Sequence, residues 1–218
     1  MNKLASAIAA LTLSTQVQAL GGQFDGGMIV NGNFGSNPAE RCVPGMTGVI
    51  PQEYTDSSIG QQWLVTQGNI DLLTSWCSGY GHVTAPNLTD TYVDLNGSFA
   101  ETGVNASGAI TQTVPTLNGQ LYKLTFEFGG NPQWLNSIYP NDTKIKGMVV
   151  WIDGLLAGTY FVDTGTAAVA VPAVNAQWKK ETIIFEANSA STTITFQSLN
   201  SSTSDFGPLL TNVAMTVY

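Results

Sequence analysis

Apolar and polar residues alternate with a period of two in several short segments of this chain. The alternation is cleanest in residues 121–128, where Leu124, Phe126 and Phe128 share one face and Lys, Thr and Glu residues take the other. It recurs in residues 192–198. Side chains that alternate in this way are typical of β-strands with one buried face. The pattern therefore predicts antiparallel sheets and an all-β fold.

Short apolar segments bounded by Gly, Asn, Pro or Asp recur through the rest of the chain. We expect strands at residues 28–34, 63–66, 70–73, 92–95, 108–114, 121–128, 146–152, 158–162, 179–186, 192–198 and 210–217. Longer irregular stretches fall at 35–62, 75–90 and 129–143. Many short strands separated by turn residues are typical of a β-sandwich or a barrel. Since no linker or repeat interrupts them, residues 20–218 are expected to form a single domain.

The charge balance limits the possible partners. The chain has 15 acidic and 7 basic residues, which gives a formal net charge of −8. Nucleic-acid binding requires clustered Lys and Arg that neutralise phosphates, and the longest basic run here is Lys179-Lys180. The composition therefore argues against a nucleic-acid partner.

Residues 1–19 have the order of a secretory signal peptide. Lys3 precedes an apolar run from Leu4 to Leu13, and Val17-Gln18-Ala19 is a small-x-small cleavage signal. The run is too short to span a bilayer, and no later segment approaches the roughly 20 apolar residues of a membrane helix. We therefore expect a secreted, extracellular protein without a membrane span.

The chain has two cysteines, Cys42 and Cys77. In an exported protein such a pair is expected to form one disulfide. The two cannot make a structural zinc site, which needs four Cys or His ligands, because His82 is the only histidine.

A series of motifs runs along residues 30–213. It comprises Val30-Asn31-Gly32-Asn33-Phe34, Trp63-Leu64-Val65, Gly68-Asn69-Ile70-Asp71, Val93-Asp94-Leu95-Asn96-Gly97, Gly108-Ala109-Ile110-Thr111-Gln112-Thr113, residues 119–126, Gly130-Asn131-Pro132, Trp178, Phe185-Glu186-Ala187, Thr195-Phe196, Gly207-Pro208 and Asn212-Val213. In this order the motifs resemble the secreted choice-of-anchor C proteins and their plant cell-wall-associated relatives, which have a galactose-binding-like jelly-roll domain. The resemblance implies an antiparallel β-sandwich that binds polysaccharide or cell-wall material, with Trp63 and Trp178 in its core.

The chain departs from the resemblance at two acidic positions. Related sandwiches often carry Glu after the Asn-Gly-x-Phe motif and Asp before the closing Asn-Val. These acids help to hold a structural calcium ion between the first and last strands. Here the positions are Gly35 and Thr211. Because calcium needs oxygen ligands with charge among them, we expect a calcium ion to be disfavoured and no other cofactor to be present.

Catalysis has little support in the sequence. A glycosidase needs two carboxylates about 5–10 Å apart. The candidates are Asp71, Asp94, Glu127, Asp153 and Asp163, with alternation placing Asp94 and Glu127 opposite apolar residues. Solvated strand and turn positions explain these acids as well. Since no nucleophile elbow, phosphate-binding loop or zinc-protease motif is present either, we expect a protein that is not an enzyme.

Sugar binding has more support in the sequence than catalysis. Sugar sites pair flat aromatic rings with amide and carboxylate groups. The stretch 129–143 combines Trp134 and Tyr139 with Asn131 and Gln133. We expect these residues to bind ligand, with Trp134 as the anchor and Tyr139 as its partner. Packing beneath a long loop explains the two rings equally well.

Further ligand-binding candidates lie in two other places. Trp76, Tyr80 and His82 share the stretch 75–90. Trp151 lies on the second face of the 146–152 strand, where it either lines a groove or is covered by packing. The acidic chain should repel polyanions, so the expected partner is a neutral polysaccharide or a cell-surface glycan.

A second class of function fits the composition as well. Low charge, many Thr and Asn residues and exposed aromatics also suit an extracellular matrix or surface protein. Such a protein would self-assemble or bind protein partners, and oligomerisation is compatible with both interpretations.

Overall fold

The computed structural model describes residues 28–34, 43–49, 63–75, 83–86, 91–97, 107–132, 143–165 and 174–218. This part of the chain consists mainly of strands: β1 (Val43–Val49), β2 (Leu64–Thr74), β3 (Val83–Thr84), β4 (Thr91–Asp94), β5 (Ala109–Pro115), β6 (Leu121–Gly130), β7 (Ile145–Ile152), β8 (Leu155–Asp163), β9 (Val174–Asn175), β10 (Lys179–Glu186), β11 (Ser191–Ser198) and β12 (Pro208–Val217). The described residues contain no helix whose length and apolarity would let it cross a membrane.

One long antiparallel sheet folds back on itself into two facing halves. Its strand order is β10-β6-β12-β4-β2-β5-β11-β7-β8, with β1 beside β2. Phe126 on β6 packs edge-on against Phe196 on β11 and Tyr160 on β8, with ring centroids 5.1 and 5.2 Å apart. These contacts join β6 to strands at the other end of the sheet order. The sheet is therefore a β-sandwich, in which β4 and β2 connect the halves.

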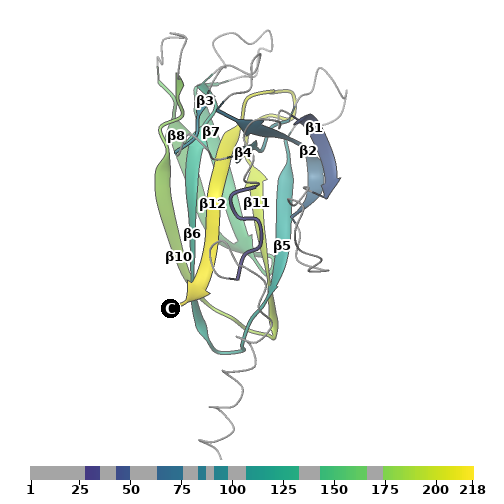
Figure 1. Cartoon of the computed structure of the whole chain (residues 1–218), viewed down its shortest axis with the longest axis vertical. Coiled ribbons are helices and arrows are strands. Elements are labelled where there is room, and N and C mark those ends of the chain that lie inside the picture. The colour runs from purple at the N-terminus through teal and green to yellow at the C-terminus, as the bar shows by residue number, and fades with distance from the viewer. Residues whose placement is uncertain are drawn as a thin grey trace, which may run out of the picture.

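The connectivity is that of a jelly roll. After β4 the chain alternates between the halves, through β5, β6, the β7–β8 hairpin, β10, β11 and β12. Figure 1 shows these strands along the long axis of the molecule, with the C-terminus at the lower end. The fold class expected from the sequence, an all-β antiparallel sandwich of the jelly-roll type, is confirmed.

The core follows the alternation in the sequence. Leu124, Phe126 and Phe128 on β6 are buried, whereas Lys123 is exposed and Thr125 and Glu127 are half-exposed. Trp63 is fully buried and packs against the rings of Phe34 and Phe196, 5.6 and 5.9 Å away. Full burial of such a side chain contributes roughly 1.5–3 kcal/mol. The core role expected for Trp63 is thus confirmed.

A second hydrophobic cluster covers the outer side of β4. It contains Leu73, Val83, Ala85, Tyr92, Ala176 and Leu209, with Trp178 packed against it. The Trp178 ring meets the Tyr92 ring edge-on at 5.9 Å. The short parallel pair of β3 and β9 belongs to this layer. Because the main core covers the other side, all residues of β4 are buried.

Two segments differ from the sequence-based expectation. Residues 28–34 were expected to be a strand, but they form bends and a turn in which Asn31 and Phe34 have positive φ values of 53° and 58°. The segment bridges β12 and β5: Val213 donates its N–H to the Gly32 carbonyl, and the Gln112 side chain bonds both the N–H and the carbonyl of Val30. Individual hydrogen bonds to distant residues, and not the regular hydrogen-bond ladder of a strand, therefore hold residues 28–34 in place.

The second difference is β1, which lies inside the expected irregular stretch 35–62. It pairs with β2 through an antiparallel register that shifts twice, between Val43 and Met46 and between Met46 and Gly48. Its sequence contains Pro44 and Gly45, which disfavour a regular strand. Only the pairing with β2 makes this segment a strand.

Candidate functional site

Most of the residues expected to bind sugar lie outside the described part of the chain. This applies to Gln133, Trp134, Tyr139, Trp76, Tyr80 and His82, and also to the cysteines Cys42 and Cys77. The structure does describe Trp151, Asn131 and the strands on either side of residues 133–142.

Trp151 lies on the outer face of the half formed by β2, β5, β11, β7 and β8. Residues that are direct partners across a sheet share a face. Thr195 pairs with Trp151 on one side and with Thr111 on the other, whereas the alternating residues Ile194 and Phe196 are in the core. The outward polar side chains around the tryptophan, together with Trp151 itself, form what we call the threonine–glutamine face: Gln67, Thr111, Thr113, Trp151, Thr193, Thr195 and Gln197. The exposed apolar residues Leu156 and Leu64, which pair directly with Trp151 and Thr111, lie on the same side of the sheet.

Hydrogen bonds hold the side chains of this face in fixed positions. Trp151 donates from Nε1 to Gln197 Oε1 at 3.1 Å, and Gln197 donates from Nε2 to Gln67 Oε1 at 3.1 Å. Gln67 in turn donates to the carbonyl of Ser107 at 3.3 Å. The half-buried tryptophan ring therefore starts a hydrogen-bonded row that runs across the sheet from β7 to β2.

The threonines form a second set of bonds on the same face. The hydroxyls of Thr111 and Thr195 are 2.7 Å apart, and those of Thr113 and Thr193 are 2.9 Å apart. These pairs lie directly opposite each other on β5 and β11. The face is thus lined with hydroxyl and amide groups whose mutual positions are already determined.

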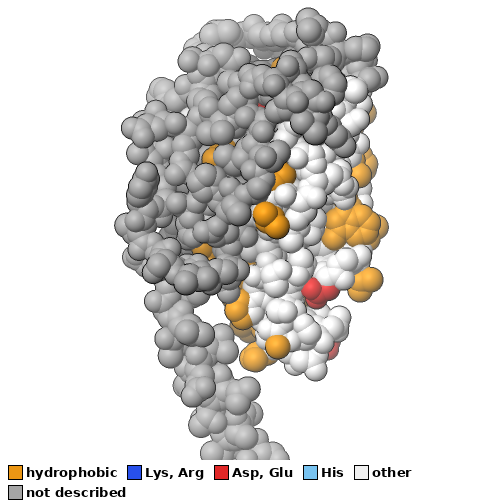
Figure 2. Space-filling model, turned by 90° about the vertical axis from the view of Figure 1, so that its right-hand side faces the viewer, with side chains coloured by type: hydrophobic (Ala, Val, Ile, Leu, Met, Phe, Trp, Pro, Cys, Tyr) orange, Lys and Arg blue, Asp and Glu red, His pale blue; other side chains and the backbone are white. Residues whose placement is uncertain are grey.

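The two outer faces of the sandwich differ in charge. Along the described part of the threonine–glutamine face, no exposed or half-exposed side chain is charged between the Lys144–Asp163 ion pair at one end and Asp153 at the other. The opposite face, on β6 and β10, carries Lys123, Glu127, Lys180 and Glu186. In Figure 2 the described part of the visible surface is mostly white, with hydrophobic groups in orange and little red. A face without charge suits an uncharged partner.

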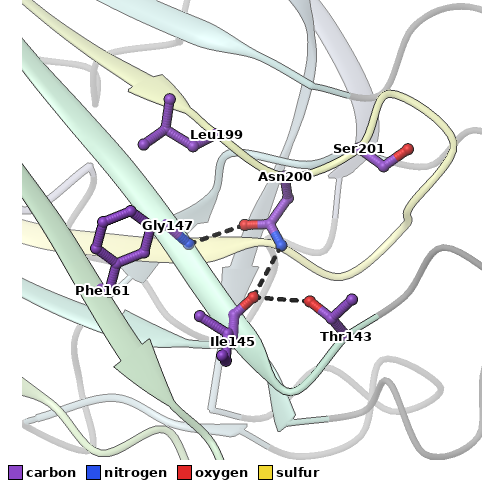
Figure 3. Close-up of a pocket in the computed structure, with 7 residues that line it drawn as sticks. All are labelled: Thr143, Ile145, Gly147, Phe161, Leu199, Asn200 and Ser201. Carbon is purple, nitrogen blue, oxygen red and sulfur yellow. Dashed lines mark hydrogen bonds between the residues drawn. The ribbon is translucent and has the colours of Figure 1, made fainter.

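A shallow pocket lies at one end of this face. We call it the Phe161 pocket; it has a volume of about 420 Å³ and is lined by Thr143, Ile145, Gly147, Phe161, Leu199, Asn200 and Ser201 (Figure 3). Gly147 and Phe161 are direct partners on β7 and β8. Thr143 is the first described residue after the 133–142 stretch, so the pocket adjoins the end of that stretch.

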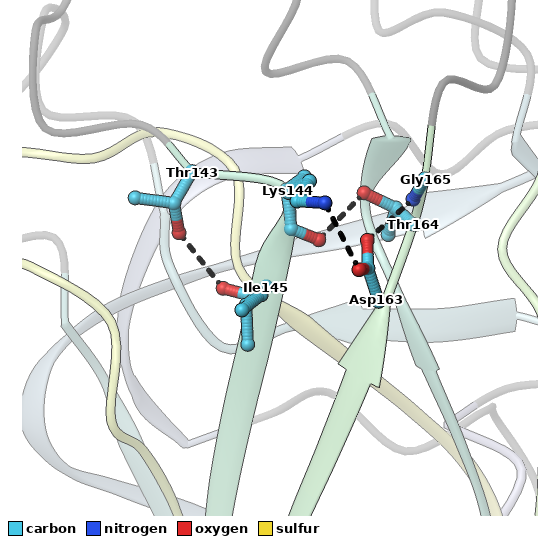
Figure 4. A network of polar contacts seen from close by, with 6 residues as sticks. All are labelled: Thr143, Lys144, Ile145, Asp163, Thr164 and Gly165. Carbon is cyan, nitrogen blue, oxygen red and sulfur yellow. Dashed lines mark hydrogen bonds and ion pairs between the residues drawn. The ribbon is translucent and has the colours of Figure 1, made fainter.

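Polar contacts hold the chain where the 133–142 stretch ends (Figure 4). Lys144 Nζ lies 3.2 Å from Asp163 Oδ2, and Thr164 donates both its N–H and its hydroxyl to the Lys144 carbonyl at 2.9 and 2.8 Å. A hydrogen bond from the Gly165 N–H, followed by the one from Lys144, lowers the pKa of the Asp163 carboxyl. The carboxylate is therefore ionised and the contact persists at neutral pH.

The other end of the stretch is held by a buried carboxylate. Asn131, directly after β6, is 2% exposed and donates from Nδ2 to Asp94 Oδ2 at 2.8 Å. Asp94 Oδ1 accepts the backbone N–H groups of Asn96 and Gly207 at 2.9 and 3.0 Å. One carboxylate thus ties the end of β4 to the residue after β6 and the residue before β12. The amide of Asn131, expected to bind ligand, points into this network.

Asp94 was expected on a solvated strand face, and that expectation is wrong. The residue is fully buried because the second cluster and the Gly207 segment cover β4 from outside. Burial raises the pKa of Asp94, and the charge of Asp71, its partner across β2 and β4, raises it further. The bond from Asn131 and the nearby charge of the buried Lys146 act in the opposite direction. A carboxyl group enclosed in this way cannot reach a sugar, so Asp94 is a structural residue.

The sequence analysis named Trp151 as a candidate but did not name the other residues of its face. Threonines and glutamines that alternate with core residues look like ordinary solvated positions. Their signal appears only when the strands are aligned, because Gln67 and Gln197 are 130 positions apart in the sequence.

The calcium positions expected from the resemblance can be placed in part. Thr211 is buried and donates its hydroxyl hydrogen to the Thr91 carbonyl at 2.7 Å, while Gly35 lies outside the described residues. Within the described ranges, no three His, Cys, Asp or Glu side chains gather as a metal site would require.

Residues 27–216 match the family described as "Protein of unknown function (DUF642)". The chain belongs to this family. The match covers all of the strands of this DUF642 protein except the last residue of β12. It does not confirm the resemblance to choice-of-anchor C proteins. A search of curated proteins gave no match.

Comparison with solved structures gives matches of low overall similarity, two of which are the following. A family 35 module from Clostridium thermocellum has a TM-score of 0.43 and 18% identity, and the alignment covers 72% of this DUF642 protein and 92% of that chain. TmCBM61 in complex with β-1,4-galactotriose has a TM-score of 0.42 and 11% identity, with 72% and 88% covered. At these values neither a ligand nor a binding residue is transferred to the DUF642 protein.

Proposed function

We propose that this protein is a secreted, non-catalytic module that binds a neutral polysaccharide on the threonine–glutamine face. In this proposal the ring of Trp151 stacks on a sugar, and the hydroxyl and amide groups around it bond the sugar hydroxyls. Trp134 and Tyr139, in the stretch 133–142, are expected to bind the sugar as well. Residues 1–19 are removed on export.

The absence of charge around Trp151, within the described part of that face, carries the proposal. Sugar rings present apolar faces to an aromatic ring and hydroxyls to amides and other hydroxyls. The row from Trp151 through Gln197 to Gln67 already holds these groups in position. Less conformational entropy is then lost on binding, which favours affinity.

A glycan array on residues 20–218 tests the proposal first. It should show binding to neutral polysaccharides and none to sulfated chains. Trp151→Ala should then lower affinity about tenfold, since losing about 1.4 kcal/mol of contact corresponds to that factor. Tyr218→Ala is the matched control, because Tyr218 is 64% exposed at the C-terminus and lies outside the face.

Trp151 is half-buried, so a second variant guards against a loss of fold. Gln67→Ala removes an exposed side chain at the far end of the hydrogen-bonded row, so the melting temperature should not change. The affinity should fall about threefold, which corresponds to a net loss near the lower end of the range for one hydrogen bond. Wild-type affinity in both variants, or an array without any neutral glycan, would contradict the proposal.

One observation favours the other class of function, self-assembly. β8 is the outermost strand at one end of the sheet order, and Leu155 and Leu156 on it are 69% and 59% exposed. Exposed hydrophobic edge strands can pair with another chain. Concentration-dependent assembly without glycan in size-exclusion chromatography, lost in Leu155→Asp, would support this function.

A further inference from the structure

The Phe161 pocket owes its shape to a glycine between two apolar side chains. A Cβ atom at Gly147 would lie 2.8 Å from Phe161 Cε1 and 3.2 Å from Leu199 Cβ. Glycine therefore leaves room for Phe161 and Leu199 to lie against the backbone of β7. Phe161 still exposes 59% of its surface. The wall of the pocket thus includes the Phe161 ring, which lies against the backbone of β7 and is largely open to solvent (Figure 3).

The polar side of the pocket is held by hydrogen bonds to β7. Asn200 accepts the Gly147 N–H through Oδ1 at 3.0 Å and donates from Nδ2 to the Ile145 carbonyl at 3.2 Å. A primary amide has two N–H groups, and this donation uses one of them. Thr143 donates its hydroxyl hydrogen to the same carbonyl at 2.8 Å, so its oxygen can still accept a hydrogen bond. The pocket thus offers a neutral donor and a neutral acceptor beside the ring.

The pocket continues the threonine–glutamine face. Gly147 and Trp151 both point outward on β7 and are four residues apart, which corresponds to about 13 Å along the strand. Phe161 pairs directly with Gly147. Two aromatic rings therefore lie on one side of the sheet at a spacing that a short oligosaccharide spans.

We propose that the Phe161 pocket is a second sugar subsite and that the protein binds an extended neutral chain laid along β7 from Trp151 to Phe161. This inference rests on the proposed function and deepens it. A chain that occupies both rings must be linear and several sugars long. The specificity is therefore for the interior of a linear polysaccharide and not for a terminal sugar.

The test compares chain lengths with linear β-1,4-linked gluco-, galacto- and manno-oligosaccharides, from the disaccharide to the hexasaccharide. Titration calorimetry on residues 20–218 should show affinity that rises with length for at least one of these series. Phe161→Ala should lower affinity for the hexasaccharide about tenfold and leave the disaccharide unchanged. Leu155→Ala is the matched control, since it removes a more exposed side chain from the other end of β8.

Three outcomes would overturn the inference. If Phe161→Ala binds every length like wild type while Trp151→Ala loses affinity, the face binds sugar but the pocket is not a subsite, and the proposed function stands. If Phe161→Ala changes only the oligomeric state in sedimentation velocity, the ring belongs to a protein contact. If wild type binds no member of the three series and no neutral glycan on the array, the proposed function fails together with the inference.

Discussion

Asp94 and Asn131 are 37 positions apart in the sequence, and a hydrogen bond of 2.8 Å joins their side chains inside the protein. Asp94 ends β4, and Asn131 follows β6 immediately before the 133–142 stretch. In its ionised form the Asp94 carboxyl can only accept, and an amide nitrogen can only donate, so the ionised pair has a defined direction. This direction makes the contact testable by exchanging its two members.

Exchanging the two residues should restore part of the stability that each single substitution removes. Asp94→Asn places an amide N–H group against the amide of Asn131, and Asn131→Asp places two carboxylates together. Each single change should cost about 1–3 kcal/mol, because it leaves buried polar groups badly paired. In the double variant the amide introduced on β4 can donate to the carboxylate introduced after β6. Urea unfolding should then show recovery of at least about 0.5 kcal/mol relative to additivity, roughly the lower limit for residues in contact. Purely additive losses would show that the pair does not act as a unit.

The burial of Asp94 should also make stability depend on pH. Its pKa in the folded protein is raised above the ordinary value near 3.8 by burial and by Asp71, so the folded state holds this proton more tightly than the unfolded state. This tighter proton binding stabilises the folded protein. The stabilisation is fully present at a pH below the pKa that Asp94 has in the unfolded chain, and it is lost as the pH rises through the pKa that Asp94 has in the folded protein. The advantage of wild type over Asp94→Asn in denaturant unfolding should therefore be larger at mildly acidic than at neutral pH. An advantage that grows toward neutral pH would contradict the assignment.

Trp134 is expected to contribute most to sugar binding. The stretch 133–142 that carries it lies between the buried Asn131 and the Lys144–Asp163 contact, so described residues are held on both sides of it. Anchor residues typically cost about 2 kcal/mol when truncated, or about thirty-fold in affinity. Trp134→Ala should show this loss in calorimetry at an unchanged melting temperature, and Tyr139→Ala a smaller one. If Trp134→Ala unfolds the protein, the ring is part of the core.

Calcium is expected not to stabilise the protein. The acid of related sandwiches is replaced at Thr211, whose hydroxyl already bonds the Thr91 carbonyl, and at Gly35. A site that binds only the native state would add about 2.7 kcal/mol at a hundred times its dissociation constant. Thermal unfolding with millimolar calcium and with chelator should give the same midpoint. If calcium raised the midpoint by several degrees and chelator reversed the rise, the protein would have a calcium site and the prediction would be wrong.

Cys42 and Cys77 are expected to form a disulfide in the exported protein. A tether between residues so far apart in the sequence stabilises by roughly 4 kcal/mol in the chain-entropy estimate. Intact mass before and after reduction and alkylation should differ by the label on two thiols. Labelling without reduction would show free cysteines and would weaken the expectation of secretion.

The strands of the sandwich could largely be predicted because their signal is local. The alternation in residues 121–128 and 192–198 specifies which side chains of β6 and β11 enter the core, whatever the rest of the chain does. The burial of Trp63 was expected from the resemblance of its motif to a known family and is confirmed. Each strand needs only the period of its own side chains to be recognised.

The sequence by itself determined the all-β class, most of the strands and the side chains that form the core. The tertiary structure alone decided that Asp94 is buried, that residues 28–34 bridge β12 and β5, and that Gln67 and Gln197 meet beside Trp151. These features depend on which strands become neighbours. Pairing between distant segments is set by the closure of the whole sandwich, because a local period carries no information about the partner strand.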